Sequence, residues 1–152
     1  MVRRILFLCV HNSSRSQMAE GFARRLLAGP GCEVASAGSE PRGVNPYAVR
    51  AMAEKGIDIS GHTSKRLDAA PAPALVVTLC AKSEESCPVY PPAVEVEHWG
   101  LPDPSLAPGS DEEKLRVFRR VRDEIERRVV DLAARLARPD RLRDPSAPAE
   151  GT

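Results

Sequence analysis

A cysteine and an arginine separated by five residues are the first side chains in this chain that could do chemistry together. Cys9 ends an apolar run, and Arg15 precedes a segment with helical periodicity. Backbone N–H groups in a short loop of this kind converge on one point and bind anions. The guanidinium of Arg15 adds a planar fork that fits a tetrahedral oxyanion. The same positive field favours the thiolate of Cys9, so the loop combines an anion site with a nucleophile.

The same spacing is open to a structural interpretation. Cysteine is commonly buried and unreactive, and a cysteine six positions before an arginine also arises by chance. The context favours a working site, because Asn12, Ser13 and Ser14 tolerate turns and helix caps. We therefore expect Cys9 to be a nucleophile inside an oxyanion-binding loop. The candidate binding residues are Val10, His11, Asn12, Ser13, Ser14 and Arg15.

The elements that must position this loop follow from apolar runs that alternate with helical patterns. A buried strand is predicted at Arg4–Cys9, followed by an amphipathic helix at Ser14–Ala28. Val94–Glu97 alternates apolar and polar residues, as an edge strand does. The other predicted elements are strands at Cys32–Ala37 and Leu75–Cys80, helices at Pro46–Lys55 and from the capping box Ser110–Glu113 to Ala137, and a helical turn after Thr63.

This alternation predicts a single-domain α/β fold, with a four-stranded parallel twisted sheet and helices on both faces. Ligands of such sheets bind beyond the carboxyl ends of the strands. Cys9, Cys80 and Asp103 all follow predicted strand ends, so the fold can bring them to one edge. We expect the domain to span residues 1–138 and the Pro- and Arg-rich residues 139–152 to form a disordered tail.

Length and composition exclude several classes of protein. The chain has 152 residues, 42% hydrophobic content and a formal net charge of +1, which suits one globular domain. This charge gives no reason to expect nucleic acid or a membrane surface as a partner, and no apolar run approaches the ~18 residues of a spanning helix. No small-residue cleavage site follows the N-terminal apolar stretch, so we do not expect it to be a signal peptide. We expect a cytoplasmic protein with reduced thiols.

Set beside Trp99–Pro104, the segment Cys9–Ser16 resembles the low-molecular-weight protein tyrosine phosphatase fold family. In that family an Asp-Pro pair late in the chain supplies a general acid, which here is Asp103. The likeness covers about Arg4 to Leu136, and it is stronger still to the thioredoxin-coupled arsenate reductases within the family. The blocks that carry it are Ser16–Gly21, Ser36–Gly38, Gly43–Pro46, Ile57–Ser60, His62–Ser64, Val77–Cys80, Cys87–Pro88 and Glu97–Gly100.

Cys80 and Cys87 distinguish a reductase from a phosphatase. A phosphatase needs only Cys9, Arg15 and Asp103, whereas a reductase must also supply two electrons, which two further thiols on a loop can do. A disulfide requires Cα atoms ~4.4–6.8 Å apart, so this loop would have to fold back. The alternatives are a buried strand cysteine beside an incidental loop cysteine, or a zinc site with His98, which would lack a fourth ligand.

The resemblance implies a mechanism in which arsenate binds in the loop and the Cys9 thiolate attacks arsenic. Asp103 protonates the departing oxygen, and Ser16 donates a hydrogen bond to the thiolate. Cys80 then attacks the Cys9 sulfur, arsenite leaves, and Cys87 attacks Cys80 to form a disulfide that thioredoxin reduces. The resemblance implies no cofactor and no metal, phosphate as an analogue of arsenate, and a monomer.

Four positions depart from the family pattern or need a special conformation. His11 and Ser14 stand where the family usually has glycine and often cysteine, and we expect His11 to point to solvent. Lys65 replaces an acidic residue that helps some members bind potassium, so we expect its ammonium to occupy that place and no potassium dependence. Asn12 is expected to take a left-handed backbone conformation.

Two other functions stay open. A phosphatase of this family would hydrolyse phosphate monoesters through a Cys9 phospho-enzyme, and weak phosphatase activity is expected in either case. Such phosphatases usually carry aromatic residues after the Asp-Pro pair, whereas Ser105 and Leu106 follow it here. The third possibility is a non-catalytic oxyanion-binding or redox-sensing module, which would require Cys9 to be inert.

Overall fold

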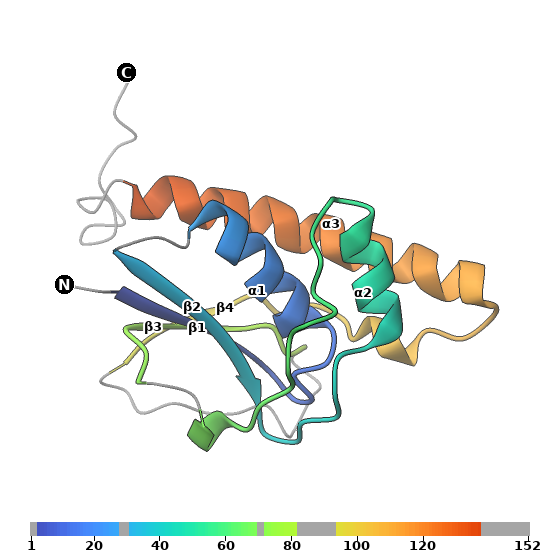
Figure 1. The fold of residues 1–152 in the computed structure, drawn as a ribbon, viewed down its shortest axis with the longest axis horizontal. Coiled ribbons are helices and arrows are strands. Elements are labelled where there is room, and N and C mark those ends of the chain that lie inside the picture. The colour runs from blue at the N-terminus through green and yellow to red at the C-terminus, as the bar shows by residue number, and fades with distance from the viewer. Residues whose placement is uncertain (1–2, 28–30, 70–71, 82–93, 138–152) are drawn as a thin grey trace.

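The computed structural model describes residues 3–27, 31–69, 72–81 and 94–137. Figure 1 shows a twisted sheet with long helices layered against one of its faces. Across the described ranges, no helix combines the length and apolarity needed to cross a bilayer.

The sheet has four parallel strands within the described residues, as predicted. Strand β1 (Arg3–Cys9) lies between β2 (Cys32–Gly38) and β3 (Leu75–Thr78), and β4 (Glu95–His98) pairs with β3 at the edge. From Ile5 to Cys9, β1 is fully buried, as central strands of parallel sheets are. The edge position predicted for the alternating last strand is confirmed, since β4 is paired on one side only.

Three α-helices of the described chain cover one face of the sheet (Figure 1). They are α1 (Arg15–Leu26), α2 (Pro46–Ala53) and α3 (Asp111–Leu136). Their apolar side chains join Ile5 and Phe7 of β1 in the main core, where each large buried side chain contributes about 1.5–3 kcal/mol of transfer free energy. The largest helical members of this core are Met18, Phe22, Met52, Phe118 and Ile125.

The opposite face of the sheet has a smaller core. Leu6, Leu8 and Val76 are buried there, and Leu67 of the 3₁₀ helix η1 (Leu67–Ala69) packs against them. Helices therefore lie on both faces in the described part of the chain, with three α-helices on one face and a single 3₁₀ turn on the other. This turn confirms the helical turn expected after Thr63.

The helix boundaries follow the local signals in the sequence. The side chain of Asn45 accepts a 2.8 Å hydrogen bond from the backbone N–H of Tyr47, and Pro46 occupies the first helical position of α2. Ser110 and Glu113 form the predicted reciprocal capping box at the start of α3. On α3, Arg128 and Glu124 pair at 3.0 Å.

The carboxyl ends of β1 and β3 lie side by side. Leu8 pairs with Thr78, and the N–H of Leu79 donates a 2.7 Å hydrogen bond to the carbonyl of Leu8. Cys9 therefore ends β1, and Cys80 follows the end of the neighbouring strand β3. Adjacent strands lie ~4.8 Å apart. The fold thus places both cysteines at the edge of the sheet where ligands of this architecture bind.

Candidate active site

The loop between β1 and α1 closes tightly against the end of β2. Asn12 has a φ of 47°, which confirms the expected left-handed conformation, one that asparagine tolerates better than most residues. A Cβ built on Gly38 would lie 2.6 Å from the carbonyl oxygen of Val10 and 2.8 Å from that of Cys9. Only glycine therefore lets β2 approach the loop this closely.

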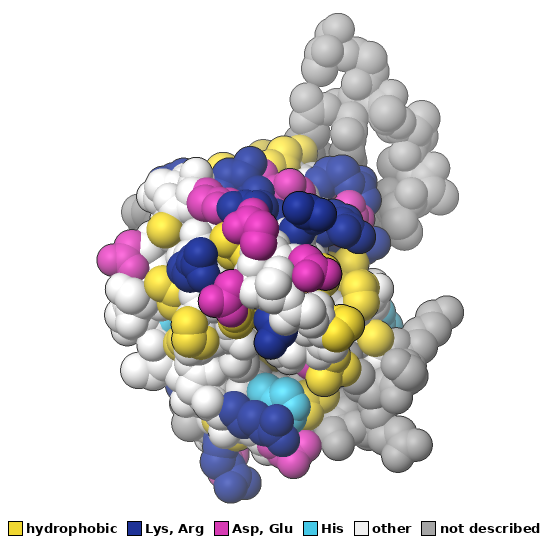
Figure 2. Space-filling model, turned by 90° about the vertical axis from the view of Figure 1, so that its right-hand side faces the viewer, with side chains coloured by type: hydrophobic (Ala, Val, Ile, Leu, Met, Phe, Trp, Pro, Cys, Tyr) yellow, Lys and Arg dark blue, Asp and Glu magenta, His cyan; other side chains and the backbone are white. Residues whose placement is uncertain are grey.

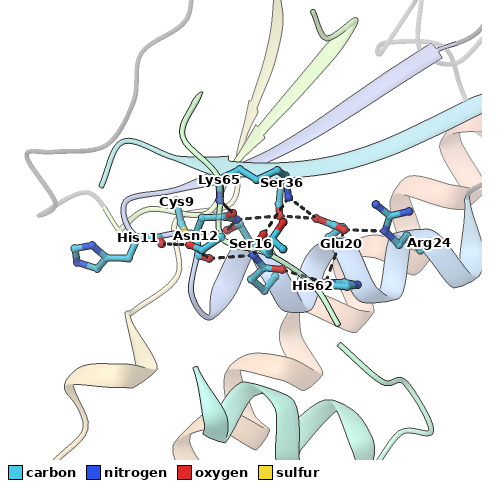
Figure 3. A network of polar contacts seen from close by, with 12 residues as sticks. Cys9, His11, Asn12, Ser16, Glu20, Arg24, Ser36, His62 and Lys65 are labelled. Atoms are coloured by element: carbon cyan, nitrogen blue, oxygen red, sulfur yellow. Dashed lines mark hydrogen bonds and ion pairs between the residues drawn. The ribbon is translucent and has the colours of Figure 1, made fainter. Parts of the chain in front are cut away.

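The Cys9 sulfur lies 2.8 Å from the Ser16 hydroxyl, a contact that the sequence analysis expected. Asn12 Nδ2 donates to Ser16 Oγ at 2.8 Å and to Ser36 Oγ at 2.9 Å. Asn12 Oδ1 accepts from the backbone N–H of Lys65, a group that can only donate, so the orientation of this amide is fixed. A Cys9 thiolate can only accept, so in that state the Ser16 hydroxyl, which also accepts from Asn12, donates its own hydrogen to Cys9 Sγ; Figure 3 shows these side chains in one network.

The network continues to Glu20, a carboxylate that is only 2% exposed (Figure 3). Ser36 Oγ donates to Glu20 Oε1 at 2.5 Å, and Arg24 Nε donates to Oε2 at 2.7 Å. The Lys65 ammonium lies 3.9 Å and His62 Nδ1 3.7 Å from the same carboxylate. A buried charge needs such compensation. The sequence analysis expected the Lys65 ammonium at the place where some family members bind potassium, and its position beside Glu20 agrees with this. The absence of potassium dependence stays a prediction.

Gln17 braces this network, and sequence reasoning missed it. Its Nε2 donates to the carbonyl oxygens of Asn12 and Thr63, both at 3.0 Å, so its Oε1 must accept, and it lies 3.0 Å from His62 Nδ1. The hydrogen of the His62 ring is thereby assigned to Nδ1. Burial lowers the pKa of His62 below its ordinary value, which favours this neutral form. No local pattern marks Gln17 as functional, because its partners lie on a distant loop.

Arg15 and Asp103 meet at this edge of the sheet, although 88 positions separate them in the sequence. Arg15 is 2% exposed, and its Nη1 donates to the carbonyl oxygens of Leu79 and Leu101 at 3.3 and 2.9 Å. Its Nη2 lies 3.7 Å from Asp103 Oδ2. Asp103 Oδ1 accepts two hydrogen bonds from Ser105, which fix the carboxylate at the start of a 3₁₀ helix, η2 (Pro104–Leu106). The predicted constellation is therefore brought together.

A pocket of about 410 Å³ opens over the loop. Cys9 and Arg15 line it from the loop, and Asp103 and Leu106 line it from the opposite side. The Ser14 hydroxyl also lines it, is buried, and has no hydrogen-bond partner among the described residues, so a polar group is available to a ligand. Of the predicted binding residues, His11, Ser13, Ser14 and Arg15 line the pocket, whereas Val10 and Asn12 are not among its lining residues.

The remaining wall of the pocket is the segment 42–46. The sequence analysis named Gly43–Pro46 as part of the resemblance but did not predict a place for it in the site. The backbone N–H groups of Glu40, Arg42 and Asn45 donate hydrogen bonds of 2.8, 3.1 and 3.0 Å to carbonyl oxygens of the anion loop. His11 Nδ1 lies 3.1 Å from the carbonyl oxygen of Glu40, so the ring is held at the rim rather than pointing freely to solvent. The sequence did offer one signal for this wall: the segment follows the carboxyl end of β2, and ligands of parallel sheets bind at such ends.

The four cysteines have different environments. Cys9 and Cys32 carry free thiols, and Cys80 is buried and disulfide-bonded. Cys80 does not line the pocket, and Cys87 lies outside the described residues. Burial raises the pKa of Cys32, which has no place in the constellation. In the described ranges, no group of three or more His, Cys, Asp or Glu side chains is arranged to hold a metal ion.

Comparison with known proteins adds to this geometry. Residues 4–142 match the family of low molecular weight phosphotyrosine protein phosphatases. The arsenate reductase of Bacillus subtilis is 52% identical over 131 residues, which are 85% of this chain and 94% of that protein. A solved arsenate reductase in the phosphate binding state is 39% identical, with a TM-score of 0.73, over 88% of this chain and 98% of that one. The thioredoxin-dependent arsenate reductase of Corynebacterium glutamicum is 30% identical, with a TM-score of 0.64, over 86% of this chain and 60% of that one.

Proposed function

The chain belongs to the low molecular weight phosphotyrosine protein phosphatase family, and from this premise we propose that it reduces arsenate to arsenite. The observation that carries the proposal is the Cys9 sulfur, which lies 2.8 Å from the Ser16 hydroxyl in a pocket that Cys9, Arg15 and Asp103 line together. The arsenate reductases at 52% identity and at a TM-score of 0.73 favour arsenate as the oxyanion.

The first chemical step is attack by the Cys9 thiolate on arsenic. The loop N–H groups and Arg15 hold the oxyanion, and the Ser16 hydroxyl stabilises the thiolate until it attacks. A sulfur–arsenic bond forms, one arsenic–oxygen bond breaks, and the proton of Asp103 goes to the departing oxygen, which leaves as water. Asp103 is suited to this role because two hydrogen bonds from Ser105 fix it beside Arg15.

The second step transfers two electrons. The Cys80 thiolate attacks the Cys9 sulfur, the sulfur–arsenic bond breaks, and its electron pair stays on arsenic, which leaves as arsenite. Cys87 then attacks the Cys80 sulfur and releases the Cys9 thiolate, and thioredoxin reduces the Cys80–Cys87 disulfide. Support comes from the place of Cys80 beside the end of β1, from its disulfide-bonded state, and from the free thiol of Cys9. The thioredoxin-dependent relative supports thioredoxin as the reductant.

Phosphate-ester hydrolysis is proposed as a weak side activity. The same loop and acid would form and release a Cys9 phospho-enzyme. No Phe, Tyr or Trp side chain is among the residues that line the pocket in the described chain, so a phenyl ring would find no large aromatic side chain to stack on there. A binding-only role is disfavoured, because nucleophile, anion loop and acid are all in place.

We also propose that residues 1–138 form the working unit, that the protein acts as a monomer, and that it acts in the cytoplasm. The last described helix ends at Leu136, which supports the domain limit. A relay that ends in a reducible disulfide requires a reducing compartment, which supports the location.

Single replacement of Cys9, Cys80 and Cys87 by serine tests the proposed function. Each variant is assayed for thioredoxin-driven arsenate reduction and for hydrolysis of an aryl phosphate. All three are expected to lose steady-state reduction, and only Cys9→Ser is expected to lose hydrolysis. Full reductase turnover in Cys87→Ser would refute the three-cysteine relay, and hydrolysis without any reduction in the wild type would favour the phosphatase. Asp103→Asn is expected to slow both reactions.

A further inference from the structure

Arg42 is a second arginine at the pocket, and the mechanism above does not use it. It lines the same cavity as Cys9 and Arg15, but its side chain is exposed. Among the residues that the structure describes, no carboxylate or carbonyl contacts its guanidinium at hydrogen-bond or ion-pair distance. It therefore differs from Arg15, which is buried and bound by two carbonyl oxygens and Asp103.

The backbone of Arg42 is nevertheless fixed against the anion loop. Its N–H donates a 3.1 Å hydrogen bond to the carbonyl oxygen of His11, and the flanking bonds from Glu40 and Asn45 hold the segment on both sides. Gly43 follows with a φ of +86°, a conformation that returns the chain toward the start of α2. Only the side chain of Arg42 is left to move, which keeps its charge near the mouth of the pocket.

The negative groups that line the cavity would repel an oxyanion, and the guanidinium of Arg42 can offset this repulsion. Before Asp103 takes up the proton that it later donates, two negative groups, the Cys9 thiolate and the Asp103 carboxylate, face an incoming oxyanion. Arg15 is already paired with Asp103. Figure 2, seen from the side of α2 and the start of α3, shows basic side chains, with one acidic side chain among them, beside a histidine at the lower end of that face. Charges at the mouth of a cleft act over about a Debye length, ~8 Å at physiological ionic strength.

We propose that Arg42 recruits the oxyanion to the mouth of the pocket and so sets the efficiency of arsenate capture without taking part in the chemical step. The inference rests on the proposed oxyanion substrate and adds a specificity-determining residue to it. Arg42 supplies the cation that an anion meets before it reaches Arg15. Its effect falls on anion affinity and on kcat/KM, whereas kcat at saturation is set by Cys9, Arg15 and Asp103.

Inorganic phosphate is the probe that tests this inference without requiring turnover. Reduced protein is treated with iodoacetamide, and the phosphate concentration that half-protects Cys9 from alkylation is measured by mass spectrometry at low and high salt. The variants are Arg42→Ala, Arg42→Lys and, as a matched control, Arg116→Ala, an exposed arginine of α3 that does not line the pocket. Thermal unfolding of each variant checks that it is folded.

At low salt, Arg42→Ala is expected to need about threefold to tenfold more phosphate, Arg42→Lys less than threefold more, and Arg116→Ala the wild-type amount. The difference should vanish at about 1 M salt, where the Debye length is ~3 Å. Unchanged half-protection in Arg42→Ala, or a loss that persists at high salt, would overturn the proposal.

Arsenate turnover separates this inference from the proposed function. In the wild type and Arg42→Ala, kcat is expected to agree within about twofold while kcat/KM falls by the factor found with phosphate. A fall confined to kcat would overturn the recruiting role. If the wild type reduces no arsenate but Arg42→Ala still needs more phosphate for half-protection than the wild type, the reductase function is refuted. Arg42 then remains an anion-recruiting residue.

Discussion

At the residue scale, one amide determines how the hydrogen bonds around the nucleophile run. Asn12 donates to Ser16 and Ser36 because its oxygen is occupied by the backbone N–H of Lys65. Ser36 donates to the buried Glu20, and Ser16 donates to Cys9 when the cysteine is a thiolate, which can only accept. The left-handed backbone of Asn12 and the orientation of its side-chain amide thus act together in forming the hydrogen bonds around Cys9.

Replacing Asn12 with aspartate tests this direction of donation. Aspartate accepts hydrogen bonds and tolerates the left-handed region, but it cannot donate to Ser16. Because a hydrogen bond to a charged group contributes about 1.5–3 kcal/mol, the pH midpoint for alkylation of Cys9 should rise by about one unit or more. Asn45→Asp is the control for the added charge, since it also places a carboxylate at the pocket, keeps the acceptor for Tyr47 N–H and leaves the hydrogen bond from Asn12 to Ser16 intact, so its midpoint should rise less. An alkylation profile that does not move in Asn12→Asp would contradict the assigned network.

Gly38 gives a second prediction at this scale. An alanine Cβ there would press on backbone atoms of Val10, Cys9 and Asn12 at 2.6–2.9 Å, and these atoms cannot rotate away. Gly38→Ala should lower the free energy of unfolding by about 2 kcal/mol and weaken phosphate binding, measured by urea unfolding and calorimetry. Gly61→Ala, where a Cβ meets nothing within 4 Å, is the control. Wild-type stability and binding in Gly38→Ala would show that the close approach is unimportant.

At the scale of elements, an ion-pair cluster joins α2 to α3 and so supports the pocket wall that precedes α2. Glu54 accepts from Arg119 Nη2 and Arg122 Nη1, both at 2.7 Å. Arg122 is only 7% exposed and also donates to the carbonyl oxygen of Ala51 at 2.9 Å. The C-terminal end of α2 is thereby attached to α3, while Asn45 caps its other end beside the pocket.

The stability that Glu54 provides should depend on pH. The hydrogen bond from Arg119 is the main cause that lowers the pKa of Glu54 from 4.5 to about 2. The unfolded chain then binds more protons between these values, so this stabilisation is full above about pH 5 and is lost as the pH falls toward 2. Glu54→Gln should lower the free energy of unfolding by about 1 kcal/mol at pH 7, a modest value because the side chain is 35% exposed.

Urea unfolding of wild type and Glu54→Gln at several pH values checks this expectation. The difference between the two proteins should shrink as the pH approaches 3. Glu112→Gln is the matched control, because Glu112 makes one 3.3 Å contact with the same Arg119 and is more exposed. A difference that stays constant from pH 7 to pH 3 would show that the ionised carboxylate is not what stabilises the α2–α3 contact.

The elements that the sequence predicted are those whose signals are local. The capping box at Ser110, the proline at position 46 and the apolar run from Leu75 each specify structure through neighbouring residues. The anion loop around Cys9 followed from the residue types and their spacing, and the role of Asp103 followed from the resemblance. The contact of Glu40, Arg42 and Asn45 with the anion loop was not predicted, because it is made by backbone hydrogen bonds, which leave no mark on residue type. The turn η2 was missed because its cap, Asp103, was interpreted through its chemistry alone.

At the scale of the whole molecule, the residues that form the core and the residues that form the site lie in different parts of the fold. The α-helices and one face of the sheet form the main core, while the loops at the carboxyl edge supply the oxyanion site and the acid. Cys80 follows β3, next to the end of β1. In the proposed relay, the loop after β1 selects the anion, and the cysteines after β3 determine the reaction.

The proposed domain limit leads to a prediction at this scale. A chain that ends at residue 138 retains every described helix and strand, since α3 ends at Leu136. Its free energy of unfolding should lie within about 0.5 kcal/mol of the full chain, and its arsenate turnover should be unchanged. Urea unfolding and the coupled thioredoxin assay measure both. A clear loss of either property would place residues 139–152 in the working unit.

Single-turnover thiol mapping tests the three-cysteine relay most directly. Fully reduced protein is mixed with equimolar arsenate in the absence of thioredoxin, quenched with an alkylating agent and digested for mass spectrometry, while arsenite is quantified. The relay predicts one arsenite per protein, a Cys80–Cys87 disulfide, and alkylated Cys9 and Cys32. Alkylation of all four cysteines with no arsenite formed would contradict it.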